Sequence, residues 1–346
     1  MARAGRRPTM KDVARVAGVS LATVSRVVNG NGDVRPDLAA RVHHAVETLG
    51  YRRDLTATTL RRADRQSASI GLVIEDVSNP FFSAVHRGVE DVARAHRVLT
   101  FAGSSDEDPG RERELAEALA TRGVDGLIIA PCSADQSFLL RDRQAGTALV
   151  FVDRPPRLID ADAVVSDNAG GARAAVEHLL RAGHRRIAFL GDRPSLFTAA
   201  ERRRGYREAL AEGGIETQSW DALERVGLID SEAARRATLD LLLAADPPTA
   251  LFTGQNLITV GAVRALRERG LQHDVSLVGF DDVMLVEMIE PGITVVRQDP
   301  YALGRHAAEL LFSQLDGYDG ESRLVVMPTE LVARGSGEIE AARARR

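Results

Sequence analysis

From residue 70 onward, short apolar runs of strand length alternate with longer amphipathic segments of helix length. The apolar runs are continuous, without a polar residue at every second position, which is typical of strands buried on both faces of a sheet. We expect strands at residues 70–74, 98–102, 126–130, 148–152, 163–166, 186–190, 250–253, 275–280 and 295–298. We expect helices between them, for example at residues 82–95, 111–121, 170–182, 201–212, 231–244 and 257–269. The alternation predicts an α/β body built on parallel sheets.

Polar side chains stand directly after many of the expected strands. In open parallel sheets, ligands bind beyond the carboxyl ends of the strands. The residues at these ends are therefore candidates for a binding site: Asp76, Asp153, Arg154, Asp192, Gln255, Asn256, Asp281 and Asp282.

A second pattern precedes the body, at residues 9–30, and predicts two short helices joined by a tight turn. Thr9 can cap the first helix, Gly18 can end it, and Ser20 can cap the second. This is the helix-turn-helix plan, in which the second helix lies in the major groove of DNA. The alternative is a helical hairpin in a protein core. The remaining polar residues favour phosphate and base contacts instead, namely Thr9, Ser20, Thr23, Ser25, Arg26 and Asn29.

A third helix, with Pro36 at its first position, is expected to close this small helical head before Gly50. The next segment, residues 52–67, is rich in arginine but not in proline or glycine. Asp54 can cap a short helix that reaches Leu60. Because so short a helix is marginal in water, we expect it to form only against a partner.

The chain has 346 residues, which suits two or three domains. Residues 1–66 hold 13 basic and 6 acidic residues, a net charge of +7, although the whole chain has −4. A basic head on an acidic body fits DNA binding at one end. The single cysteine, Cys132, excludes an internal disulfide and a multi-cysteine metal site. We find no apolar run of 18 residues and no signal-peptide pattern, so we expect a cytoplasmic protein without a membrane span.

Taken together, these residues resemble the lac-repressor/galactose-repressor family of bacterial transcription factors over almost the whole chain. The motifs that carry the resemblance are Asp-Val-Ala at 12–14, Ala-Gly-Val-Ser at 17–20, Thr-Val-Ser-Arg-Val-Val-Asn at 23–29, Ser-Asn-Pro-Phe-Phe at 78–82, Asp-Gly-Leu-Ile-Ile at 125–129, the segments 178–180 and 183–188, Gly-Tyr at 205–206 and Val-Gly-Phe-Asp-Asp at 278–282. The resemblance implies an all-α helix-turn-helix head at residues 1–51, a hinge helix or linker at 52–67 and a body like periplasmic sugar-binding proteins at 68–346. The body would comprise two parallel-sheet subdomains that clamp a small effector. Residues 68–165 and 293–325 would form one and residues 166–292 and 326–346 the other, with crossovers near Val165, Gly292 and Val325.

For the head, the resemblance assigns base reading to Leu21, Ala22 and Arg26. Leu21 and Ala22 are apolar and suit thymine methyl groups, whereas Arg26 can reach guanine. Phosphate contacts would come from Thr9, Ser20, Thr23, Ser25 and Asn29. Ala57 and Leu60 match the hinge-helix pair, and the leucine would wedge into the minor groove at the operator centre. Asp54 departs from the family, which commonly has asparagine there.

For the effector, the resemblance assigns Phe81, Asp153, Arg202, Gln255 and Asp281 to the site between the subdomains. An aspartate and an arginine can each form two hydrogen bonds with vicinal hydroxyls or ring nitrogens, which suits a polar ligand. Each residue also has a structural alternative. Arg202 lies in a charged run that can be a solvated helix face, Asp281 can cap a following helix, Asp153 can bond loop amides, and Phe81 can belong to the core. Gln255-Asn256 stands where many members have Asn-Asp.

The function that follows is a homodimeric repressor that binds a pseudo-palindromic operator and is switched by a small effector, most simply a sugar or sugar derivative. A purine or nucleoside corepressor is the alternative within the family. An α/β enzyme acting on sugars is the alternative outside it. No phosphate loop, dinucleotide-binding glycine motif, nucleophile elbow or metal-spaced His/Cys/Glu cluster supports an enzyme. We therefore expect no catalytic activity, no cofactor and no metal. The C-terminal segment has no leucine heptads, so we expect no tetramerisation helix there.

Overall fold

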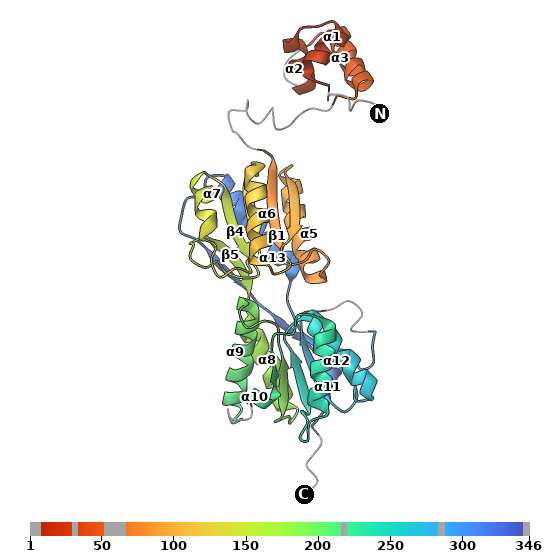
Figure 1. Cartoon of the computed structure of the whole chain (residues 1–346), viewed down its shortest axis with the longest axis vertical. Coiled ribbons are helices and arrows are strands. Elements are labelled where there is room, and N and C mark those ends of the chain that lie inside the picture. Colours follow the sequence, from red (N-terminus) through yellow and green to blue (C-terminus); the bar gives the residue numbers. More distant parts are fainter. Residues whose placement is uncertain (1–7, 30–33, 52–66, 216–219, 283–287, 342–346) are drawn as a thin grey trace. The chain divides into compact units, whose positions relative to one another are not determined.

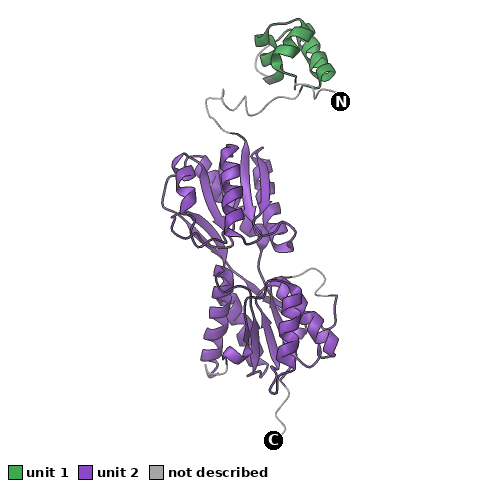
Figure 2. Ribbon diagram, viewed as in Figure 1, with its two compact units in different colours: residues 1–67 green, residues 68–346 purple. Residues whose placement is uncertain are grey.

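The computed structural model describes residues 8–29, 34–51, 67–215, 220–282 and 288–341. It consists of two compact units, residues 1–67 and residues 68–346, which Figure 2 shows in green and purple. We describe the first unit as the head and the second as the body.

The head contains three helices: α1 (Met10–Ala17), α2 (Leu21–Asn29) and α3 (Pro36–Leu49). Thr9 and Asp12 form a reciprocal capping box at the start of α1, and Gly18 ends that helix with a positive φ of 62°. The Ser20 hydroxyl accepts a hydrogen bond from the Thr23 amide at 3.1 Å, so Ser20 caps α2. These local signals turn the chain sharply between the two helices, as the sequence predicts.

A small apolar core holds the three helices together. Its buried members are Val13, Ala17, Val24, Val42, Ala45 and Tyr51. Val16 does not join them, because its side chain is 45% exposed. The expected hinge helix, including Asp54, Ala57 and Leu60, lies outside the described residues.

The body has two lobes, each built on a six-stranded sheet (Figure 1). The first lobe has parallel strands in the spatial order β11 (Leu324–Met327), β5 (Asp162–Ser166), β4 (Ala148–Val152), β3 (Gly126–Ile129), β1 (Ser69–Ile74) and β2 (Leu99–Ser104). Helices α5 (Pro80–Ala95) and α13 (Pro300–Leu315) pack on one face of this sheet. The other face is covered by α6 (Pro109–Thr121) and by a short 3-10 helix (Ser137–Leu139) that leads into α7 (Leu140–Gln144).

Helices α5 and α13 come from distant parts of the sequence and pack with their backbones very close. A Cβ on Gly88 would collide with the Tyr301 carbonyl oxygen, and a Cβ on Gly304 would collide with the Val85 carbonyl oxygen. Two glycines at facing positions therefore permit this contact, which attaches the later segment of the chain to the first lobe.

The second lobe repeats the arrangement. Its strands lie in the order β12 (Glu330–Val332), β10 (Thr294–Arg297), β9 (Ser276–Phe280), β8 (Ala250–Thr253), β6 (Ile187–Leu190) and β7 (Glu224–Arg225). Only the pairing of β12 with β10 is antiparallel among these described strands. Helices α8 (Asn168–Arg181) and α9 (Phe197–Glu212) cover one face, and α11 (Ser231–Leu242) and α12 (Asn256–Arg269) cover the other. The short α10 (Trp220–Leu223) leads into β7.

The chain passes between the lobes three times (Figure 1). The first passage follows β5, next to the expected Val165. The second lies after Arg297 rather than near Gly292, because β10 pairs with β9 and so still belongs to the second lobe. The third lies between β11 and β12 rather than at Val325, because residues 324–327 pair with β5 in the first lobe. The apolar pattern locates the strand at 295–298 but not the sheet that it joins, which explains the second passage. The strand at 324–327 is not predicted, which explains the third.

The sequence analysis does not predict β7, β11 or β12. All three are short strands at sheet edges. In β11, Leu324 and Val326 are exposed, so the strand lacks the continuous burial that identifies the central strands. Edge strands are stabilised mainly by backbone pairing, which leaves a weak signal in the side chains.

Candidate functional site

A polar pocket with an empty volume of about 420 Å³ lies between the two lobes of the body. The first lobe contributes Glu75, Asn79, Phe81, Phe82, Asp153 and Arg154, and the second contributes Asp192, Thr198, Ala199, Arg202, Gly254, Gln255, Asn256, Asp281 and Gln298. The structure therefore brings together all five residues that the sequence analysis assigns to an effector.

Arg202 projects from α9 and is 5% exposed, so it is not part of a solvated helix face. Its Nε donates to Asn168 Oδ1 at 2.7 Å, and its Nη1 donates to the Gly254 carbonyl at 2.7 Å. The guanidinium lies over the Phe280 ring, 3.8 Å from the ring centre. Burial lowers the pKa of Arg202, while nearby carboxylates oppose that effect. These contacts fix one end of the guanidinium and hold the side chain at the pocket wall.

Asp281 follows β9 and is 7% exposed. Its backbone has φ of 75°, a left-handed conformation that an aspartate tolerates better than most residues. Its Oδ1 accepts a hydrogen bond from Gln298 Nε2 at 2.5 Å, and its Oδ2 lies 3.7 Å from Arg202 Nη1. The neighbouring Asp282 is paired with Arg334 at 2.7 Å and does not line the pocket. The two consecutive aspartates thus have different partners, and Asp281 is the one that faces the pocket.

The first lobe places a buried charged cluster beside the pocket. Arg154 donates from Nη2 to Glu107 Oε1 at 2.5 Å and from Nη1 to the Pro131 carbonyl at 3.2 Å. Its Nε lies 3.3 Å from Asp153 Oδ2, and its Nη2 lies 3.6 Å from Glu75 Oε2. One guanidinium is therefore shared by three carboxylates.

Burial and neighbouring charges shift the pKa values of the residues in this cluster. Burial, and then the negative charge of Glu107, raise the pKa of Glu75 to about 8. Burial also raises the pKa of Asp153. Burial disfavours the charged form of Arg154, but Glu107 and Asp153 outweigh it and raise the pKa of that guanidinium. Glu75 is thus a carboxyl group that retains its proton near neutral pH.

Gln255 and Asn256 occupy the start of α12, at the mouth of the pocket. Gln255 Oε1 accepts from the amides of Leu257 at 2.7 Å and Ile258 at 3.3 Å, which caps the helix. Asn256 instead reaches across to the first lobe, where its Nδ2 donates to Asn79 Oδ1 at 2.8 Å. Gln255 therefore caps the helix, and Asn256 forms a bond between the lobes.

Two further contacts define the edges of the pocket. Arg193 of the second lobe lies 3.6 Å from Glu107 Oε2 of the first lobe, which is a second connection between the lobes. Phe81 is half-buried and packs edge-on against the buried Phe82, with ring centres 5.0 Å apart. Of the two adjacent phenylalanines, Phe82 belongs to the core and Phe81 is the more exposed.

Several pocket residues are not among the sequence candidates. These are Glu75, Asn79, Thr198 and Gln298, with Glu107 and Arg193 directly behind the wall. Glu75 stands immediately after β1 and carries the same strand-end signal as Asp76. Gln298 directly follows β10, but the expected strand at 295–298 includes it, and Arg193 adjoins the candidate Asp192. Asn79, Glu107 and Thr198 lie further from the expected strand ends, and the packing of the two lobes brings them to the pocket.

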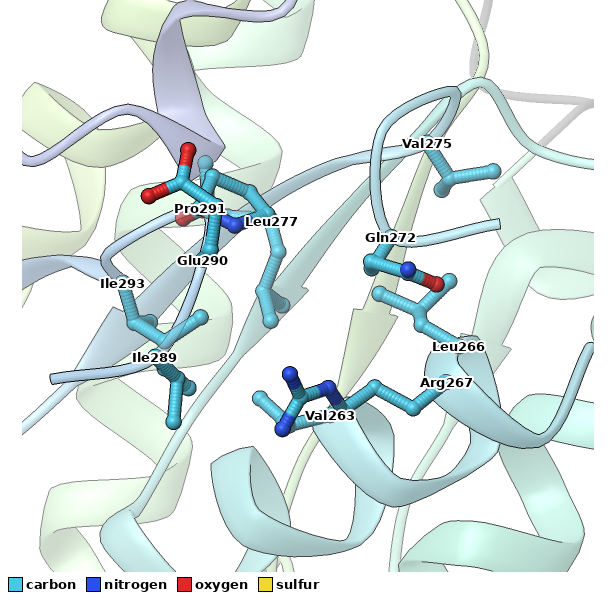
Figure 3. A pocket seen from close by; sticks show the side chains of 11 residues that line it. Val263, Leu266, Arg267, Gln272, Val275, Leu277, Ile289, Glu290, Pro291 and Ile293 are labelled. Atoms are coloured by element: carbon cyan, nitrogen blue, oxygen red, sulfur yellow. The ribbon is translucent and has the colours of Figure 1, made fainter. Parts of the chain in front are cut away.

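A second pocket, of about 280 Å³, lies within the second lobe (Figure 3). Its walls come from α12 and from the chain before β10, and most are apolar: Val263, Leu266, Val275, Leu277, Ile289, Pro291 and Ile293. None of the sequence candidates lines it. Its charged side chains in the described part of the chain are one arginine, Arg267, and one glutamate, Glu290, whereas the pocket between the lobes gathers more than one of each charge. We therefore take the pocket between the lobes as the candidate effector site.

The head presents part of α2 to solvent. Leu21 is 44% exposed, and Ala22 and Arg26 are exposed beside it. Ser20 and Thr23 are hydrogen-bonded to each other at 2.9 Å, and Thr9 is occupied by its cap with Asp12. Ser25 is half-buried, and the side chain of Asn29 and the residues Ala57 and Leu60 lie outside the described part. The N-terminal half of α2 is thus accessible, as base reading from a helix-turn-helix requires.

Two other classes of site are not found among the described residues. No group of three His, Cys, Asp or Glu side chains there has a metal-binding arrangement. No helix in that part of the chain has the length and apolar character needed to cross a membrane.

Family models match both units of the chain. Residues 9–54 match the model for bacterial regulatory proteins of the lacI family, and residues 176–337 match a periplasmic binding protein-like domain. Catabolite control protein A of Priestia megaterium is 31% identical over 331 residues, covering 95% of this chain and 98% of that protein. The chain belongs to the lacI family.

Other relatives also match over almost the whole length of both chains. The HTH-type transcriptional regulator CelR of Thermobifida fusca is 33% identical and covers 96% of this chain and 99% of its own length. The lac repressor dimer bound to operator and the anti-inducer ONPF has a TM-score of 0.80 at 26% identity and covers 96% of this chain and 99% of that chain. A CelR–cellobiose complex has a TM-score of 0.70 at 30% identity, with 95% and 100% coverage. The protein is therefore a DNA-binding transcriptional regulator and not an enzyme.

Proposed function

We propose that this regulator is a repressor whose operator affinity is set by a small polar effector, most simply a sugar or sugar derivative, in the pocket between the lobes. The observation that supports it most directly is the convergence of Arg202, Asp281 and Asp153 on one pocket. Relatives support the ligand class, since one was solved with cellobiose and another, from Enterococcus faecium, with ribose. The protein would act in the cytoplasm, where its operator lies.

In this proposal the second helix of the head reads the operator. Leu21 and Ala22 would contact thymine methyl groups, and Arg26 would reach guanine in the major groove. Thr9, Ser20, Thr23, Ser25 and Asn29 would hold phosphates and set the register. Ala57 and Leu60 would serve the paired hinge helices at the operator centre.

Within the pocket, Arg202 would donate to ligand oxygens, and Asp153 and Asp281 would accept from hydroxyl groups. Gln255 would contribute its amide nitrogen, since its oxygen caps α12. Phe81 would cover an apolar face of the ligand. A ligand held by both lobes favours their closed arrangement, which coupling to the head converts into a change in operator affinity of about 1–3 kcal/mol.

We further propose that the repressor is a homodimer, as suits a pseudo-palindromic operator. Strand β2 lies at an edge of the first sheet and exposes Leu99 (60%) and Phe101 (48%). On the second lobe, α12 exposes Leu257 and Val260, each at 36%. Apolar side chains at such positions are typical of subunit contacts. Sedimentation equilibrium of the full chain should give twice the monomer mass, and a monomer at micromolar concentration would contradict the proposal.

The decisive experiment compares Arg202→Ala with Arg204→Ala. Arg204 lies on the same helix but is about half exposed and pairs only with Glu201 and Glu208 among the described residues. An operator is first selected from random duplexes with the full-length protein, and its affinity is then measured with and without sugars and purine bases. Arg202→Ala should lose the effector response while retaining operator affinity, whereas Arg204→Ala should retain both. Equal loss of both properties in Arg202→Ala would show that Arg202 is structural.

A further inference from the structure

Carboxylates outnumber arginines around the pocket between the lobes. The acidic side chains in its wall or directly behind it are Glu75, Glu107, Asp153, Asp192 and Asp281, and the basic ones are Arg154, Arg193 and Arg202. The described part of the chain places no lysine or histidine in the wall. The pocket therefore has a surplus of negative charge when its carboxyl groups are ionised.

The pairing of these groups shows where the surplus lies. In the second lobe, Arg202 lies 3.7 Å from Asp281, and Asp153 and Asp192 also act on it electrostatically. In the first lobe, Arg154 is divided among Glu75, Glu107 and Asp153. Arg193 adds little to this balance, because it lies 3.6 Å from both Glu107 and Asp192. The first lobe thus holds more carboxyl groups than arginines, and Glu75, at 3.6 Å, is the most distant of the three from Arg154.

Other positive potentials near the pocket are already engaged. The N-termini of α5 and α12 carry partial positive charge, but the side chains of Asn79 and Gln255 accept hydrogen bonds from their first free amides. Burial raises the pKa values of Glu75 and Asp192, although Arg154 and Arg193 oppose that effect. A cation entering the pocket would favour their ionised forms.

Buried acceptors in the pocket also lack donors. Gln298 is 7% exposed and lines the pocket, yet its Oε1 accepts no hydrogen bond from any described residue. Glu107 Oε2, directly behind the wall, also accepts no hydrogen bond from the described part of the chain, but Arg193 lies 3.6 Å from it. The donor Arg154 Nε forms no hydrogen bond with a described residue either, but it lies 3.3 Å from Asp153 Oδ2. Since a buried acceptor without a partner is costly, Gln298 Oε1 favours a ligand that carries a donor.

We infer that the effector is a polyhydroxylated molecule with a protonated amine, such as an amino sugar, and that the pocket rejects sugars carrying phosphate or carboxylate groups. The hydroxyls would bind Arg202, Asp281 and Asp153, and the ammonium group would lie toward Glu75. This inference rests on the proposed function, because it assigns a chemical class to the same effector site. A charge-assisted hydrogen bond to Glu75 should increase affinity by about tenfold or more over the matching neutral sugar.

The test uses matched sets of ligands that differ in one group. The full-length protein is titrated by calorimetry with glucose, galactose and mannose, with the 2-amino-2-deoxy form of each, and with the 6-phosphate of each. At least one amino sugar should bind about tenfold more tightly than its parent, and the phosphates should not bind. Glu75→Gln should remove most of this advantage. Glu114→Gln, at an exposed position on α6, is the matched control and should preserve it.

Each other outcome overturns the inference. Binding of a neutral sugar or a phosphate at least as tightly as its amino form would show that the surplus charge does not select the ligand. An amine preference that survives Glu75→Gln would place the selecting group elsewhere, and absence of binding by every amino sugar would exclude the assigned class. The proposed function is judged separately. It fails only if no operator is bound, or if Arg202→Ala does not lose the effector response while retaining operator affinity as Arg204→Ala does.

Discussion

The central strands of the two lobes follow the same order, but the walls that the lobes contribute to the pocket differ in their balance of charge. In the second lobe, Arg202 is held by Asn168, a backbone carbonyl and a single carboxylate. In the first lobe, Arg154 has no such balance and is shared by three carboxylates. Both arginines are almost fully buried, so the difference lies in their partners and not in their exposure.

This difference separates two tasks that a binding site must perform. The balanced wall of the second lobe can orient hydroxyl groups without a change of protonation. The wall of the first lobe is sensitive to charge, because a carboxyl group with a raised pKa responds to any cation or anion placed beside it. Affinity for a polyol and selection by charge would then be controlled from different lobes, and the following substitutions test that separation.

The largest effect is expected for Arg154→Met compared with Arg202→Met. Removing Arg154 leaves the buried Glu107 and Asp153 and the half-buried Glu75 without their shared cation, which should cost about 3–5 kcal/mol in the free energy of unfolding at pH 7.5. Removing Arg202 should cost less, because Asp281 retains its hydrogen bond from Gln298. Urea denaturation of the full chain measures both values.

The same comparison has a pH signature. At pH 5.5 Glu75 is protonated and no longer needs a counter-charge, so the cost of Arg154→Met should shrink, and the protein should refold there if it does not fold at pH 7.5. Equal costs for the two variants at both pH values would contradict the difference between the lobes.

A smaller effect of opposite sign is expected for Glu75→Gln. The pKa of Glu75 is raised from 4.5 to about 8 by burial and by Glu107, so the folded state holds this proton more tightly than the unfolded chain. Its stabilising contribution is complete below about pH 4.5 and is lost as the pH rises through 8. Glutamine resembles the protonated carboxyl group and does not ionise, so the variant keeps this stabilising contribution as the pH rises. Glu75→Gln should therefore raise Tm at pH 8 by roughly 2–4 °C for each kcal/mol relieved.

Thermal unfolding between pH 5 and pH 8 measures this effect. Glu114→Gln provides the control, since it should leave the pH dependence as in the wild type. A decline in Tm with pH that is equally steep in Glu75→Gln and the wild type would assign the effect to another group.

The smallest effect is expected for Asn256→Ala, which removes the neutral hydrogen bond between the lobes. The loss should be about 1 kcal/mol, typical of one net hydrogen bond between uncharged groups. Arg193→Gln removes the charged connection to Glu107 and serves as the companion variant. Because Arg193 is 39% exposed, its contribution should decrease in high salt, whereas that of Asn256 should not. Salt-independent losses in both variants would contradict this distinction.

The sequence predicts the central strands well because their burial on both faces leaves continuous apolar runs, as in 148–152 and 250–253. It fails to predict β7, β11 and β12, where pairing of the backbone at a sheet edge decides the structure. It also assigns residues 294–297 to the wrong lobe, since the apolar pattern of β10 is compatible with either sheet. Five pocket residues follow from the family resemblance, but Glu107 reaches the site on the loop after β2, and Gln298 directly follows β10, the strand assigned to the wrong lobe.

By itself, the sequence determines the caps and turn of the head, the alternation of strands and helices, and the strand ends that carry Asp153, Gln255 and Asp281. These features depend on neighbours within a few positions along the chain, so local physics suffices. The tertiary structure alone decides that Arg154 is shared by Glu75, Glu107 and Asp153, and that Asn256 meets Asn79 across the lobes. Electrostatic balance depends on distances between residues far apart in the sequence, and only the packed lobes establish those distances.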